Sequence, residues 1–175
     1  MKTKPLASIS VESHTDELND ALKRLAKAQI LVGIAKGSKG DRRNDGAPPN
    51  SDLGYIHEHG SPAANIPPRP FLVPGVKGAR DQIVKGLRAA MKAALKGDEK
   101  ACDGLMERTG MQTVSAVKSY MQTADFAPLK PATIRNRNRS RQTIGKRENE
   151  EAGESIRPLI NTGALRNAID YYVEK

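Results

Sequence analysis

The sequence predicts a single α+β domain over residues 1–175, with long polar loops. Three stretches carry apolar residues at helical spacing, and two short apolar runs far apart in the chain are typical of strands. Two further segments are rich in turn formers or in charge and lack periodicity. With 37% hydrophobic and 3% aromatic residues, the core is expected to be thin and aliphatic. Such a core favours a subunit that gains stability from neighbours in an assembly.

The first half of the chain predicts one helix, one strand and one loop. Residues 13–29 have leucine and alanine at helical spacing, and Ser13 with Asp16 resembles a capping box. Residues 30–34 form a short continuous apolar run, expected to be a buried strand. Residues 37–51 hold three glycines and two prolines, which predicts a long, mobile loop.

Residues 53–59 predict a short helix, and Gly60, at the C′ position, is expected to end it. A proline-rich run follows, and residues 75–96 then carry the strongest helical pattern in the chain. Pro67, Pro68, Pro70 and Pro74 fix φ at four of eight positions, so the run is expected to be rigid and extended.

A second long helix is expected to begin after an Asp98 cap and to end near Asp125. Gly104 and Gly110 weaken the expectation that this helix is continuous. Residues 127–157 show no useful periodicity and predict a second long, mobile loop. A short capped turn and a final strand over residues 168–173 complete the chain.

The proline-rich run presents Arg69 and Phe71 in a defined direction, which is typical of a docking surface or structural junction. Glu58 is expected to accept hydrogen bonds from nearby backbone N–H groups or to pair with Arg69. His57 and His59 look like metal ligands, but their spacing places them on different faces of a helix, whereas ligand pairs use i, i+3 or i, i+4.

No catalytic set stands out, so the chain is predicted not to be an enzyme and to use no cofactor or metal. The glycine-rich residues 33–40 depart from the phosphate-loop pattern, because Ser38 stands where lysine is needed. Cys102 is the only cysteine, which excludes an internal disulfide, and it is expected to be an ordinary buried residue. No apolar run is long enough for a signal peptide or a membrane span.

The formal net charge is +9, which favours an anionic partner. The run RNRNRSR places arginine at every second position, and an extended chain would present these side chains as a comb on one side: Arg135, Arg137, Arg139 and Arg141. A nucleic-acid-binding module using this comb is therefore an alternative function. Two other interpretations of this run are open. It is either a solvated loop that pairs with the acidic residues 148–154, or an arm that docks on an acidic neighbouring subunit.

Four segments, in order along the chain, resemble those of a known protein family. They are ILVGI at 30–34, GYIHEHGS followed by NIPPRPFL between 54 and 72, PLKPATI at 128–134, and PLINTGALRNAI at 158–169. The corresponding family pieces are a V-G-I strand, IHEFG with IPARPFL, PLSPATI and LIDTGALRNSI. His59 stands where phenylalanine is usual, and Pro68 where alanine is usual. The family comprises the neck or tail-completion proteins of tailed bacteriophages, similar to minor tail protein Z and Mu-type virion morphogenesis proteins.

This resemblance implies a non-enzymatic structural component of the virion, present in the host cytoplasm during assembly. Such proteins form rings, commonly hexamers, at the head–tail junction. The implied partners are a head connector or stopper protein and a tail terminator or tail tube protein, with possible non-specific contact to channel DNA and none to a membrane. The implied fold is a small, mostly antiparallel sheet packed against one or two long helices, with long interface loops.

The resemblance also assigns expected roles to motif residues. Glu58 and Gly60, with the proline-rich segment Pro67, Arg69, Pro70 and Phe71, are expected to build the passage from sheet to helix. Phe71 and Leu72 are expected to be buried anchors. Thr162 and Gly163 are expected to form a tight turn before the last strand. The loops at 37–51 and 135–154 are expected to meet neighbouring subunits or line a DNA channel.

Overall fold

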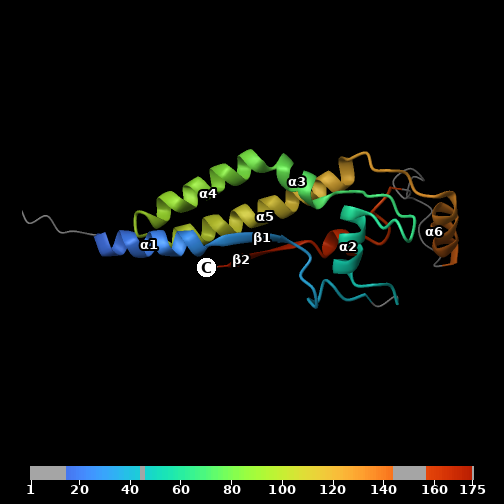
Figure 1. The fold of residues 1–175 in the computed structure, drawn as a ribbon, viewed down its shortest axis with the longest axis horizontal. Coiled ribbons are helices and arrows are strands. Elements are labelled where there is room, and N and C mark those ends of the chain that lie inside the picture. The colour runs from blue at the N-terminus through green and yellow to red at the C-terminus, as the bar shows by residue number, and fades with distance from the viewer. Residues whose placement is uncertain (1–14, 44–45, 144–156, 175) are drawn as a thin grey trace, which may run out of the picture.

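A computed structural model describes residues 15–43, 46–143 and 157–174, and it confirms the α+β fold. These residues contain seven helices and one two-stranded antiparallel sheet (Figure 1). In chain order the elements are α1 (Thr15–Lys27), β1 (Gln29–Gly33), α2 (Asn50–His59), α3 (Leu72–Gly78), α4 (Arg80–Ala94), α5 (Glu99–Thr123), α6 (Pro131–Thr143), α7 (Ala164–Asn167) and β2 (Asp170–Glu174). The capping residue Ser13 lies outside the described residues.

The sheet joins two segments from opposite ends of the chain. β1 and β2 pair in a register that runs from Gln29 opposite Glu174 to Gly33 opposite Asp170. Alternate residues such as Val32 and Tyr171 turn inward and pack on the core beneath α5. The prediction that this strand is buried is wrong, because a single helical layer covers only one of its faces.

Helices α4 and α5 form an antiparallel pair that runs along most of the molecule (Figure 1). Gly97 turns the chain between them with φ +77°, and the Asp98 carboxylate accepts a hydrogen bond from the N–H of Ala101 at 2.9 Å. The predicted cap is therefore confirmed. At this end of the pair Ala90, Ala94, Cys102 and Met106 form a small core cluster.

The single helix expected over residues 75–96 is divided into α3 and α4 at Ala79. α3 begins at Leu72, so Pro74 belongs to its first turn and not to the extended run. Proline is tolerated there because the N–H of a first-turn residue has no partner within the helix.

The loop prediction for residues 127–157 is wrong over 131–143, where the chain forms α6. Arginine and glutamine have high intrinsic helix propensity, which favours a helix without an apolar stripe. Residues 144–156 of that predicted loop lie outside the described residues. In the other predicted loop, 37–51, α2 already begins at Asn50.

α5 is continuous through both of its glycines, but the two positions have opposite surroundings. A Cβ added at Gly104 would enter open space, whereas a Cβ on Gly110 would overlap the ring of Tyr171 from β2. We expect Gly110→Ala to destabilise the fold by about 1–3 kcal/mol through overpacking. Gly104→Ala, its control on the same helix, is expected to stabilise it by about 0.5–1 kcal/mol. Urea denaturation measures both, and equal effects of the same sign would contradict the close approach of β2.

Candidate functional site

The region with the densest specific contacts is the passage from α2 to α3, which we call the junction and define by Glu58, Gly60, Arg69 and Phe71. It contains the predicted motif residues of the proline-rich run. Figure 1 places it at the end of the α4–α5 pair, where α2, α3 and the last short helix approach one another.

Glu58, near the end of α2, caps the start of α3. One carboxylate oxygen accepts hydrogen bonds from the N–H groups of Phe71 at 2.7 Å and Leu72 at 2.9 Å, and the other accepts from Val73 at 3.0 Å. The expectation of backbone donors is thus confirmed. The alternative prediction, that Glu58 pairs with Arg69, is wrong, because the Arg69 guanidinium binds the carbonyls of Ala127 and Pro128.

The Glu58 carboxylate accounts for all the free N–H groups at the start of α3. The first four backbone N–H groups of a helix have no partner within it. Glu58 accepts three of them, and the fourth position is Pro74, which has no N–H. A negative charge at this end of a helix also interacts favourably with the helix dipole. Glu58 and Pro74 together let α3 begin abruptly after an extended segment.

Arg69 connects the junction to the segment that follows α5. Its side chain is 5% exposed, and it donates from Nε to the carbonyl of Ala127 at 2.7 Å and from Nη2 to that of Pro128 at 2.9 Å. Burial lowers the pKa of Arg69, but a guanidinium remains charged at any physiological pH. The charge is therefore used to hold two backbone carbonyls in place.

Phe71 lies in the core where three of the four motif segments meet. Its side chain is 2% exposed and shares one core cluster with buried residues of α5 and of the C-terminal motif, Val114, Val117, Met121, Leu159, Leu165 and Ile169. Val32 and Ile34 from the first motif pack against the same cluster. The buried role expected for Phe71 is confirmed, whereas Leu72 is only half-buried.

Two glycines make the turns expected of them. Gly60 has φ +80° after α2, and a Cβ there would lie 3.0 Å from the nitrogen of Pro68. Gly163 has φ +78° immediately before α7, and the Thr162 hydroxyl accepts a hydrogen bond from the N–H of Ala164 at 3.3 Å. Pro67 and Pro70 lie in the segment without regular structure that leads into Phe71.

His57 packs behind the junction and carries an unusual nitrogen. Its Nδ1 is buried and has no hydrogen-bond partner among the described residues. Burial lowers the pKa of His57, and the positive charges of Arg69 and Arg137 lower it further. The side chain is therefore neutral at pH 7, while its backbone carbonyl accepts a hydrogen bond from the N–H of Arg69 at 2.6 Å.

The lowered pKa of His57 predicts loss of stability in mild acid. The unfolded chain takes up the proton near the ordinary pKa of 6.5, before the folded chain does. The contribution of neutral His57 to the free energy of unfolding is therefore complete above that pH. It is lost as the pH falls towards the lower pKa that His57 has in the folded chain. We expect the free energy of unfolding to fall less between pH 7 and 5 in His57→Gln than in the native protein. An unchanged slope in His57→Gln would contradict the assignment.

The arginine comb expected in an extended chain is wrong, because these residues lie on α6. Successive arginines at a spacing of two turn to different faces of a helix. Arg135 and Arg139 are exposed, and Arg137 donates to the carbonyls of Arg157 at 3.0 Å and Ile160 at 3.2 Å. Arg141 is in the same helix. Arg137 therefore binds backbone carbonyls of the C-terminal segment and does not belong to a one-sided row of arginines.

Asp41 and Asn50 organise the 37–51 segment, and neither was predicted to do so. The buried Asp41 carboxylate accepts from the N–H groups of Gly37 and Ser51, both at 2.7 Å, and these bonds hold its pKa below its usual range. Asn50 is 2% exposed and donates to the carbonyl of Gly40 at 2.7 Å. Their position among glycines and prolines could have indicated this role, since Asp and Asn side chains bind nearby backbone groups in turns.

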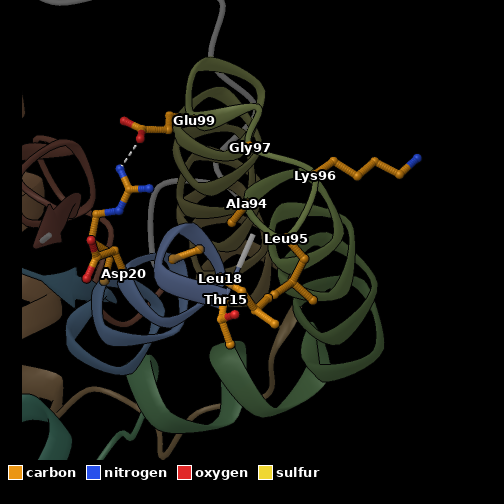
Figure 2. A pocket seen from close by; sticks show the side chains of 10 residues that line it. Thr15, Leu18, Asp20, Ala94, Leu95, Lys96, Gly97 and Glu99 are labelled. Carbon is orange, nitrogen blue, oxygen red and sulfur yellow. Dashed lines mark ion pairs between the residues drawn. The ribbon is translucent and has the colours of Figure 1, made fainter. Parts of the chain in front are cut away.

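A groove lies at the opposite end of the molecule, between α1 and the turn from α4 to α5. It has a volume of about 1210 Å³ (Figure 2). Leu18 from α1 and Leu95 from the end of α4 extend toward this space, while Lys96 points away. An ion pair between Arg24 and Glu99 joins its two sides. The lining thus mixes apolar side chains with a paired charge, and the described residues around it form no arrangement suited to catalysis.

Within the described ranges, no group of three or more His, Cys, Asp or Glu side chains is arranged to hold a metal ion. Cys102 is buried among apolar side chains, as expected. Over the same part of the chain, none of the helices combines the length and apolar character needed to cross a membrane.

Comparison with known proteins finds no matching family model, no similar curated protein and no similar solved structure.

Proposed function

We propose that this protein is a non-enzymatic structural subunit of the neck of a tailed bacteriophage, which completes the tail and joins it to the head. The proposal starts from the four sequence motifs that resemble the neck and tail-completion family. Its expected partners are further copies of itself in a ring, a head connector or stopper protein, and a tail terminator or tail tube protein.

The observation that carries the proposal is the convergence of these motifs on the junction. Three of the four segments supply residues to one core cluster: Val32 and Ile34, Phe71, and Leu159 with Leu165. The fourth is held beside them, because Arg69 donates a hydrogen bond to the carbonyl of Pro128. The segments that carry the resemblance are therefore neighbours in the fold, which supports the proposal.

Exposed apolar side chains support a role within an assembly. Leu18 and Leu22 on α1 and Met91 and Leu95 near the end of α4 are each 44–49% exposed, and they lie at the end that carries the groove. Leu31 and Tyr172 are 50% and 66% exposed on the sheet. Leu18 and Leu95 line the same groove, and Leu31 is opposite Tyr172 in the sheet, so each pair forms a contiguous apolar patch. Such patches are typical of surfaces that meet other proteins.

Deletion of the gene from its phage tests the proposal. We expect filled heads and separate tails to accumulate, and expression of the native protein in trans to restore joined particles. Glu107→Gln, an exposed change on α5, serves as a complementation control that retains function. Joined, infectious particles made without the protein would refute a neck function.

The alternative, a nucleic-acid-binding module, stays a prediction with weaker support because its extended comb is absent. Duplex binding that weakens steeply with salt and is lost on replacing Arg135 and Arg139 would favour it. Binding that ignores both replacements would reject it.

A further inference from the structure

The two-stranded sheet has two edges that no other described strand pairs with. A two-stranded ribbon has two outer edges, each with backbone N–H and C=O groups that its partner strand does not reach. Within the described residues, no backbone hydrogen bond connects the outer edge of β1 or β2 to another segment. A two-stranded ribbon needs further strands or a packed helix to be stable, and here α5 packs against one face and leaves the edges unpaired.

The outer face of the ribbon is apolar at its centre. Leu31 and Tyr172 are directly opposite each other in the register, and they are 50% and 66% exposed. Gln29 and Glu174 lie beside them on the same face and form a side-chain hydrogen bond at 2.5 Å. This face is therefore an ordered surface with an apolar centre. Along β2 the N–H of Tyr171 is bonded to the Asp170 carboxylate at 2.9 Å, and no other segment of the described residues pairs with either strand.

The charges on the two strands differ, and this difference disfavours pairing of β2 with another β2. β2 carries Asp170 and Glu174, whereas β1 carries no acidic residue and begins two residues after Lys27, the last residue of α1. Antiparallel pairing of β2 with another β2 about Tyr172 would set Asp170 opposite Glu174, and parallel pairing would set like acids together. Like charges directly opposite each other destabilise a sheet. Pairing of β2 with a β1 strand has no such cost.

We propose that β2 of one copy of this chain pairs antiparallel with β1 of the next copy, so that the ribbons join into one continuous sheet. When copies of the chain are related by one rotation axis, all β1 strands run in the same sense around that axis. Each β2–β1 contact between copies is then antiparallel, like the pairing within one copy. Contacts of this head-to-tail kind close into a ring when the rotation permits. The inference rests on the proposed function, for which it supplies the interface between neighbouring subunits.

Single-cysteine crosslinking tests this contact in the full-length protein. Two variants, Leu31→Cys and Tyr172→Cys, are made in a Cys102→Ala background, and one carries a tag that makes it longer on a denaturing gel. They are oxidised to allow disulfide formation, separately and as a mixture, and are analysed without reductant. A disulfide joins only residues whose Cα atoms lie within about 7 Å, so it excludes equivalent positions two strands, or about 10 Å, apart. We expect a covalent heterodimer in the mixture and no covalent dimer from either variant alone. Val73→Cys on α3, also half-exposed, replaces Leu31→Cys in a control mixture that is expected to give no heterodimer.

Native mass spectrometry of the same samples gives the assembly state and separates the outcomes. A covalent dimer from one variant alone indicates like strands in contact and overturns the inference. A closed ring without the heterodimer also overturns it, and leaves the proposed neck function standing. A protein that stays monomeric at every concentration overturns the sheet contact, while the gene deletion independently decides the neck function.

Discussion

Phe71→Ala is expected to lower the free energy of unfolding by about 3–5 kcal/mol, the cost of deleting a buried aromatic side chain. Phe71 is 2% exposed and shares a core cluster with residues from α5 and the C-terminal motif, and Val32 of β1 packs against this cluster. The cavity would open where these segments meet. A segment that moved to fill the cavity would lose its contacts with the other segments around it. We therefore expect the structure to relax little and the cavity to remain. Chemical denaturation followed by circular dichroism measures the change.

Phe126→Ala is the matched control, since it makes the same change at a half-buried position. Phe126 packs edge-on against Tyr120 with ring centroids 6.1 Å apart, and it borders the core cluster without being buried in it. A smaller loss, about 1–2 kcal/mol, is expected because less apolar area returns to water. If Phe126→Ala costs as much as Phe71→Ala, then Phe71 is not the centre of the core.

Glu58→Gln is expected to destabilise the fold by about 2–3 kcal/mol. The change keeps the size of the side chain, but it replaces one acceptor oxygen by an NH₂ group and removes the charge. Hydrogen bonds to a charged group contribute about 1.5–3 kcal/mol each, and loss of a helix cap costs about 1 kcal/mol. The new NH₂ group would face a backbone N–H of α3, so at least one donor loses its partner. Thermal and urea unfolding measure the loss.

Glu107→Gln removes the same charge from an exposed position of α5 and is expected to change stability by less than about 0.5 kcal/mol. The comparison isolates the cap from the effect of net charge. Hydrogen exchange adds a local readout, because the amides of Leu72 and Val73 should exchange faster in Glu58→Gln. Protection of these amides equal to that in the native protein would show that Glu58 does not cap α3.

Local chemistry made much of this fold predictable. The periodic apolar residues of α1, α4 and α5, the Asp98 cap and the positive-φ turn at Gly60 each depend on residues close in sequence. The motif segment also predicted a buried Phe71 and a Glu58 bound to backbone donors, and both are confirmed.

What failed depends on segments distant in the chain. The partners of Arg69 lie after α5, and the need for glycine at 110 comes from Tyr171 on β2, so neither is visible in a local window. α6 was missed because its one apolar residue after the first turn, Ile134, makes no periodic stripe. The half-exposure of β1 follows from the absence of a second layer over the sheet in the described residues.

The pairing of β1 with β2 has a consequence for synthesis. β1 leaves the ribosome well before β2, its only partner strand within the described chain, and β2 follows the segment that supplies Leu165 and Ile169 to the core around Phe71. Contacts between such distant segments form slowly, because a long loop must close before they stabilise the chain. A nascent chain that lacks β2 therefore presents no finished ribbon. Under the proposed sheet contact, synthesis of β2 would be the step after which the chain can pair with a neighbour.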